Sequence, residues 1–171
     1  MNGETVTLDV RPVETLLDAL RAAGYWGVKR GCETGDCGSC TVLRDGRAVN
    51  ACVTLAAQAG GSEITTVEAL AEDGDLHPLQ EAFLARAAVQ CGYCIPGILL
   101  SAKALLDEIE LPDEDQVREA LAGNLCRCTG YVKPVEAILA VVDERRRRKA
   151  LGEPVSGAAA PGPRKNRGPA R

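Results

Sequence analysis

The sequence contains few aromatic residues and no long apolar segment. Among its 171 residues there are one Trp, one Phe and three Tyr, while apolar residues make up 46% of the chain. Any core must therefore be built from Ala, Leu, Val and Ile. No run approaches the ~18 consecutive apolar residues that indicate a membrane-spanning helix. The first residues, MNGETVTLDV, lack the basic and then apolar pattern of a signal peptide. We expect a cytoplasmic protein without a membrane span.

The sequence also lacks the common catalytic constellations. It has a single histidine, His77, and no paired carboxylates, Ser-His-Asp set or Gly-rich phosphate loop stands out. A lone histidine before a proline at a predicted helix start is more typical of a structural hydrogen-bonding group than of a ligand or base. We therefore assign no catalytic residue in this chain.

Charge is divided unevenly along the chain. Residues 1–144 hold 11 basic and 23 acidic residues, and residues 145–171 hold 9 basic and 1 acidic. An acidic body argues against nucleic-acid binding by the folded part. The run Arg145 to Lys149 could be a patch for nucleic acid or an anionic surface, but a solvated helix end is the more common explanation. Because residues 145–171 show no periodic apolar face, we expect a basic disordered tail.

Eight cysteines are present, and the first four lie close together in sequence. Their spacing, C-x4-C-x2-C with a distant fourth member, is typical of a plant-type [2Fe–2S] cluster. Zinc is the main alternative, although zinc ribbons usually use two C-x2-C pairs. Disulfides do not persist in a reducing cytosol. This first ligand set comprises Cys32, Cys37, Cys40 and Cys52.

The other four cysteines form a second, less specific set. They are the C-x2-C pair Cys91 and Cys94 and the C-x-C pair Cys126 and Cys128. Spacing alone leaves both zinc and an iron–sulfur cluster open. We favour a second cluster, because two clusters in one chain can form an electron relay, whereas a zinc ion beside a cluster has no evident use.

Local patterns predict a small mixed sheet with one helix in residues 1–72. Residues 5–10 alternate polar and apolar side chains, which indicates a half-buried strand. Helical spacing follows over 13–23, and the glycine-rich segment 31–40 is expected to be a loop. A hairpin with an Asp-Gly turn is expected over 41–49, and a last strand over 64–67.

Residues 73–144 change to helical periodicity. Prolines at 78, 96 and 134 indicate three helix starts. Asp113 and Gln116 have the spacing of a capping box, and Gly123 follows the last apolar residue of that helix. The chain therefore has an α+β pattern: a sheet domain, then an all-α four-helix domain with cysteines at helix ends.

The residues around the cysteines resemble those of a known family. GCETGDCGSCTV at 31–42, QCGYCIPG at 90–97 and GNLCRCTGY at 123–131 occur in that order, together with LHPLQ at 76–80. They resemble the iron–sulfur motifs of the molybdenum hydroxylases, a family that includes xanthine dehydrogenases, aldehyde oxidoreductases and carbon monoxide dehydrogenases. The resemblance covers roughly residues 2–143.

The resemblance implies the small iron–sulfur subunit of such an enzyme. It implies a β-grasp ferredoxin-like domain, then a helical [2Fe–2S] domain. Electrons would pass from molybdopterin on a large subunit to the second ligand set, then to the first set, and on to FAD on a medium subunit. It also implies that Gln90 and Cys128 contact the pterin. Substrate conversion would occur on another chain, so purines, aldehydes, carbon monoxide and N-heteroaromatics all remain open.

The start of the chain departs from the family pattern. The family has a full strand before the Asn-Gly turn, which here lies at Asn2-Gly3 and has only Met1 before it. We expect either a true start upstream of Met1 or a sheet without its first strand. Two other hypotheses stay open at this point: a free-standing two-cluster electron carrier, and a zinc-stabilised interaction module.

Overall fold

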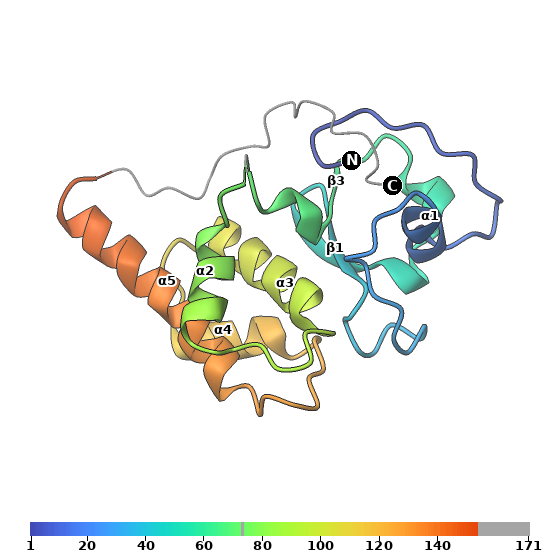
Figure 1. Ribbon diagram of the computed structural model, residues 1–171. Coiled ribbons are helices and arrows are strands. Elements are labelled where there is room, and N and C mark those ends of the chain that lie inside the picture. The colour runs from blue at the N-terminus through green and yellow to red at the C-terminus, as the bar shows by residue number, and fades with distance from the viewer. Residues whose placement is uncertain (73, 154–171) are drawn as a thin grey trace.

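The computed structural model describes residues 1–72 and 74–153 (Figure 1). The first half of the chain forms a three-stranded sheet with a short helix. The second half forms a group of helices that lies beside it. In Figure 1, strand β1 stands between helix α1 on one side and helix α3 on the other. The α+β class expected from the sequence is confirmed.

The sheet is built around the expected hairpin. β1 (Thr41–Arg44) pairs antiparallel with β2 (Arg47–Asn50), and also with the short β3 (Ile64–Thr65), which gives the order β2-β1-β3. The turn residues Asp45 and Gly46 have φ values of 51° and 79°. Two positive φ angles are what a tight hairpin turn with the right twist requires, so the Asp-Gly pair explains this turn.

Helix α1 (Leu16–Ala22) covers the sheet. The Thr15 side chain caps the helix by accepting a hydrogen bond from the Asp18 N–H at 3.1 Å. Its leucines are buried with residues of the sheet and of the loop that precedes it. The members of this core are Leu16, Leu17, Leu20, Val28, Cys40, Val42, Ala51, Cys52, Ala59 and Ile64. Two of the predicted ligands thus lie within the core.

The strand predicted over Thr5–Val10 is not formed. This segment is largely exposed, and no backbone hydrogen bond between described residues involves it. A strand needs a neighbour to satisfy its N–H and C=O groups, and no other described segment pairs with it. The preceding turn is anchored instead, because Asn2 N–H donates to Ile64 O at 2.8 Å.

The helical half contains α2 (Pro78–Ala85), α3 (Ile95–Glu108), α4 (Glu114–Leu121) and α5 (Val132–Ala150). The predicted capping box of α4 is present: Gln116 N–H donates to Asp113 Oδ1 at 2.8 Å, and the Gln116 side chain accepts from Asp113 N–H at 2.9 Å. Leu43 and Leu70 of the first half join the core of these helices. The two halves therefore share buried surface.

His77 has the structural role expected of it. It is the N-cap of α2, where its Nδ1 accepts the Leu79 N–H at 3.2 Å. Burial, and then the positive charges of Lys103 and Arg145, lower the pKa of His77 to about 4. The ring is therefore neutral at pH 7 and can act as a cap acceptor.

Helix α5 is longer than predicted. The disordered tail was expected to begin at residue 145, but the helix runs to Ala150, so the prediction of disorder is wrong for residues 145–150. Arg145 is only 7% exposed and donates through Nη1 to Leu106 O at 2.7 Å, near the end of α3. This contact and the favourable position of cations at a helix C-terminus explain the extra turns. Residues 154–171 of the predicted tail lie outside the described residues.

No helix in the described part of the chain is both long and apolar enough to cross a bilayer.

Candidate functional site

The loop of residues 31–40 wraps around the sulfur atoms of its own cysteines. Cys32 Sγ accepts the backbone N–H groups of Thr34 at 3.4 Å and Cys37 at 3.3 Å, and Cys37 Sγ accepts the Cys32 N–H at 3.4 Å. The close approach depends on Gly31, since a Cβ there would lie 2.6 Å from Cys37 Sγ. Amides aimed at sulfur suit thiolate ligands, which carry negative charge.

The other two cysteines of the first set enter from the hairpin. Cys40 directly precedes β1, and Cys52 lies in the short 3-10 helix η1 (Ala51–Val53) after β2. They are 2% and 7% exposed, and their thiols contact each other. The Cys40 thiol also interacts with Cys37. All four thiols of the first set therefore converge, with Cys32 at the surface and Cys40 and Cys52 inside.

The pKa values of two thiols in this set are shifted in opposite directions. Hydrogen bonds from the hydroxyl and the backbone N–H of Thr34 lower the pKa of Cys32 to about 6. Burial raises the pKa of Cys40 to about 11. Because metals bind the thiolate, binding at this site must release a proton from Cys40 at neutral pH.

The second set is assembled from two loops far apart in sequence. Cys94 is the N-cap residue of α3, and Cys91 lies in the loop before it; Cys126 and Cys128 lie between α4 and α5. Hydrogen bonds join the thiols of Cys94 and Cys126 and those of Cys91 and Cys128. Cys94 is buried, whereas Cys91 and Cys128 are exposed. The fold thus brings together all four cysteines of this set.

Thr129 shapes the environment of Cys126. Its hydroxyl donates to Cys126 Sγ at 3.1 Å, and its backbone N–H donates to the same atom at 3.5 Å. Burial acts to raise the pKa of Cys126, but hydrogen bonds from Thr129, the Cys128 backbone and the Cys94 thiol together outweigh it, and the pKa is lowered. Burial raises the pKa of Cys94 to about 12. The pKa values of these two contacting thiols are therefore shifted in opposite directions.

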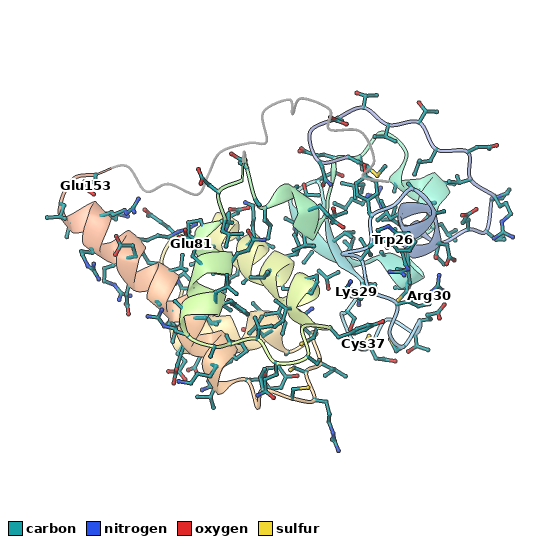
Figure 2. The ribbon with its side chains drawn as sticks, in the orientation of Figure 1. Trp26, Lys29, Arg30, Cys37, Glu81 and Glu153 are labelled. Carbon is teal, nitrogen blue, oxygen red and sulfur yellow. The ribbon has the colours of Figure 1, made fainter. Side chains whose placement is uncertain are left out.

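The two ligand loops touch each other. Leu125 N–H donates to Cys37 O at 2.9 Å, and Leu125 is followed by Cys126. One hydrogen bond therefore links the backbone of a first-set ligand to the residue beside a second-set ligand. In Figure 2, Cys37 lies in the loop region between the sheet half and the helices. The geometry suits transfer of electrons from one site to the other.

The thiol environments fit iron–sulfur clusters. All eight cysteines are free of disulfides, each set converges, and sulfur atoms accept amide or hydroxyl hydrogen bonds in both. Within residues 1–72 and 74–153, no three His, Cys, Asp or Glu side chains are arranged to hold a metal ion as they stand. The assignment of the cysteines to clusters therefore rests on thiol pairing and loop conformation.

Gln90 is exposed in the loop between α2 and α3, directly before Cys91. Cys128 is exposed as well. A side-chain amide offers both donors and an acceptor to the edge of a heterocycle. Both residues predicted to contact a pterin are thus accessible from outside the chain. Trp26, labelled in Figure 2, is 62% exposed. The Arg21 guanidinium lies over its ring, 5.1 Å from the ring centroid.

Sequence reasoning missed the polar contacts that support the sites. Thr129 and Asn124 lie inside a recognised motif, but nothing in their spacing indicates which atoms they contact. Asn124 is 3% exposed and bonds to residues of the other half. A buried Asn must have partners, but burial of Asn124 could not be read from its position after a glycine.

Comparisons with known proteins agree with this geometry. Residues 1–71 match the family described as "2Fe-2S iron-sulfur cluster binding domain", and residues 66–139 match the "[2Fe-2S] binding domain". The nicotinate dehydrogenase small FeS subunit of Eubacterium barkeri is 48% identical over 144 residues, covering 84% of this chain and 92% of that protein. The nicotine 6-hydroxylase small subunit of Paenarthrobacter nicotinovorans is 54% identical over 140 residues, covering 81% and 84%.

A solved structure shares the fold as well as the sequence. A chain of quinoline 2-oxidoreductase from Pseudomonas putida 86 superposes with a TM-score of 0.81 at 47% identity, over 85% of this chain and 92% of that one. These matches extend along nearly the full length of the relatives and favour an electron-transfer subunit over a free-standing carrier. The chain belongs to the small iron–sulfur subunits of the molybdenum hydroxylase family.

Proposed function

We propose that this chain receives electrons at the second ligand set from molybdopterin on a large subunit and delivers them from the first set to FAD on a medium subunit. The observation that carries the relay between the two sets is the contact between the loops, where Leu125 N–H donates to Cys37 O. Each set is also accessible to a partner subunit, because Cys91 and Cys128 are exposed at the second set and Cys32 is exposed at the first.

The residues of the chain hold the clusters and control their surroundings. The first set (Cys32, Cys37, Cys40, Cys52) and the second set (Cys91, Cys94, Cys126, Cys128) would each ligate one [2Fe–2S] cluster as thiolates. Such clusters supply one-electron oxidation and reduction. Burial of Cys40, Cys52 and Cys94 keeps water from one side of each site. The N–H groups of Thr34 and Thr129 donate to ligand sulfurs, which stabilises added negative charge.

The exposed residues at the second set define the face for the molybdenum-bearing partner. Gln90 and Cys128 both lie at the surface beside these ligands. We assign Gln90 to hydrogen-bond the pterin edge and Cys128 to lie against it. Replacement of Gln90 by Ala, with Gln58→Ala as an exposed control in the first half, should weaken assembly with the large subunit or slow cluster reduction by substrate. Unchanged assembly and reduction would contradict this role.

The finer fold assignment follows from the same layout. We propose a β-grasp ferredoxin-like domain over residues 1–72 and a four-helix domain over 73–144. A helix packed on a hairpin that carries the ligands supports the first, and helices α2 to α5 around one core support the second. The sheet is smaller than a β-grasp usually is, since the segment 5–10 does not pair.

The names of the relatives suggest a substrate class for the complex. Two of the relatives are named for nicotinate and nicotine, and the solved structure is named for quinoline. We propose that the complex containing this chain oxidises an N-heteroaromatic ring of the pyridine type, as in nicotinate and quinoline. Assays of the purified complex with nicotinate and quinoline, and with an aldehyde and xanthine as alternatives, test this. Turnover of only the last two would contradict it.

Iron and acid-labile sulfide analysis of anaerobically purified chain tests the cluster assignment. We expect about four irons and four sulfides per chain, and two distinct electron paramagnetic resonance (EPR) signals after reduction. Cys126→Ser should remove one signal and Cys37→Ser the other, each leaving about two irons. Zinc without sulfide in the wild type would overturn the proposed function.

A further inference from the structure

The backbones of the two ligand loops are packed without space for a side chain. A Cβ on Gly38 would lie 2.2 Å from Gly123 O, and a Cβ on Gly97 would lie 2.3 Å from Gly38 O. Gly38 lies between the ligands Cys37 and Cys40, and Gly97 lies three residues after Cys94. Three segments that carry cluster ligands therefore meet at one tight contact, which we call the seam: Gly38, Gly97, Gly123 and Asn124.

Asn124 is the polar side chain at the centre of the seam. Its Nδ2 donates to Gly38 O at 3.0 Å and to Thr41 Oγ1 at 3.2 Å. Both acceptors belong to the first half, more than 80 residues earlier in the sequence. The Asn124 side chain is almost completely buried, and a buried hydrogen bond is costly to lose because its partners are left unpaired. The two loops are thus held by directional bonds and not by apolar packing alone.

The backbone around Asn124 is fixed to the second ligand set. Tyr131 Oη donates to Asn124 O at 3.0 Å and accepts the Cys126 N–H at 2.7 Å. One phenol therefore joins Asn124 to the ligand two residues later. On the other side, Thr41 Oγ1 donates to Gly38 O at 2.7 Å, and Thr41 follows the ligand Cys40. Asn124 is therefore connected by buried and partly buried hydrogen bonds to the neighbourhood of ligands in both sets.

We propose that Asn124 is a positioning residue for electron transfer: it holds the two ligand loops at one fixed separation and so sets the rate of the electron step between the two sites. In that step one electron leaves the reduced cluster of the second set and reduces the oxidised cluster of the first, and no bond is made or broken. The inference rests on the proposed function, because it requires a cluster at each set.

The test compares two asparagines that make similar bonds. Asn50 Nδ2 donates to Gly35 O at 2.6 Å, in the same ligand loop, but this bond lies wholly within the first half. Asn124→Ala and Asn50→Ala each remove a hydrogen bond from a side-chain amide to a glycine carbonyl of that loop. Only the first removes a bond between the halves. Asn50→Ala therefore serves as the matched control.

The readouts are the spin–spin splitting between the two reduced clusters in EPR spectra of the full chain, and the rate at which substrate electrons reach the first-set cluster in the assembled complex. We expect Asn124→Ala to lose or broaden the splitting and to slow the rate, because the coupling between two clusters falls as their separation increases. Asn50→Ala should retain both. Equal behaviour of the two variants would overturn the proposal.

Iron analysis separates this outcome from failure of the proposed function. Wild type without two clusters would refute the function itself, whereas four irons in Asn124→Ala with wild-type splitting and rate would refute only the role of Asn124. If Asn124→Ala does not load iron, Asn124→Leu decides, because a side chain of similar size fills the site without donating to Gly38 O or Thr41 Oγ1. Wild-type splitting and rate in Asn124→Leu would then overturn the proposal.

Discussion

The two ligand sets are built in different ways. Three ligands of the first set lie within nine residues, and the sulfurs of Cys32 and Cys37 accept hydrogen bonds from the backbone of this loop. The ligands of the second set come from the start of α3 and from the segment before α5, so they meet only when the helices pack. The shape of the first site is thus mainly local, and that of the second is mainly tertiary. The seam is an exception, because Gly38 belongs to the first loop but is packed against Gly123 and Asn124 of the other half. The conformation of the first loop therefore also depends on tertiary contacts.

The sharpest test of the comparison uses one glycine from each ligand loop. Gly38 and Gly92 both have positive φ, 66° and 84°, but a Cβ on Gly92 would meet nothing closer than 3.9 Å. Gly38→Ala should cost roughly 2–5 kcal/mol, from strain and overpacking together, and Gly92→Ala about 1–2 kcal/mol from strain alone. Thermal or urea unfolding of the cluster-loaded chain measures both. Equal costs would mean that the first loop does not depend on the other half.

The dependence of the second set on helix packing can be tested at Arg145. Arg145→Ala leaves Leu106 O without its buried donor and should cost about 1–3 kcal/mol. The neighbouring Arg146 is well exposed, so Arg146→Ala should change stability by about 0.5 kcal/mol or less. Arg145→Ala should also release iron from the second set before the first. Simultaneous loss of both EPR signals during urea titration would contradict the separation of the two sites.

Acid should weaken the helical half selectively through His77. Its pKa is lowered from 6.5 to about 4 by burial, so the unfolded chain binds a proton between these values and the folded chain does not. The stabilising contribution is therefore present above pH 6.5 and is lost as the pH falls toward 4, by about 1–2 kcal/mol after allowance for solvent screening. His77→Asn keeps a cap acceptor without this titration.

The comparison of wild type and His77→Asn gives the measurement. Between pH 7 and pH 5 the melting temperature of wild type should fall further than that of His77→Asn. Identical pH profiles would show that the ring is solvated and titrates normally.

The smallest expected effect concerns the hydroxyl bond to Cys126. Thr129→Val removes the donor at 3.1 Å, which makes added negative charge on the second cluster less favourable. A loss of about 1 kcal/mol corresponds to a potential about 40 mV more negative for a one-electron couple. Thr129→Ser keeps the hydroxyl and should restore the potential. Redox titration monitored by EPR would detect the shift, and a change at the first cluster instead would reverse the assignment of the signals.

Local chemistry made much of the fold predictable. The Asp45-Gly46 turn and the Asp113/Gln116 capping box each specify their backbone within a few residues, and the structure has both. The loop conformation of residues 31–40 was predictable for the same reason. The segment 5–10 was not, because alternation predicts a strand only if a partner strand lies beside it.

Long-range contacts set the limit of prediction. Arg145 looked like the first residue of a solvated basic run, but packing buries it against the end of α3 and extends α5 to Ala150. Asn124 stood within a recognised motif, yet its partners lie more than 80 residues away. Neither residue type nor spacing encodes such contacts, which depend on how the completed halves fit together.

The position of the seam has a consequence for how the chain is made. Synthesis proceeds from the N-terminus, so all four cysteines of the first set leave the ribosome before Asn124 and Leu125 are added. A nascent chain that ends before residue 124 already contains all four cysteines of the first set. The carbonyl groups of Cys37 and Gly38 in this chain still lack their donors, Leu125 N–H and Asn124 Nδ2. The bonds that later close this side come from residues beside the second set. The first site therefore reaches its final conformation only after the residues beside the second set have been synthesised and have packed against it.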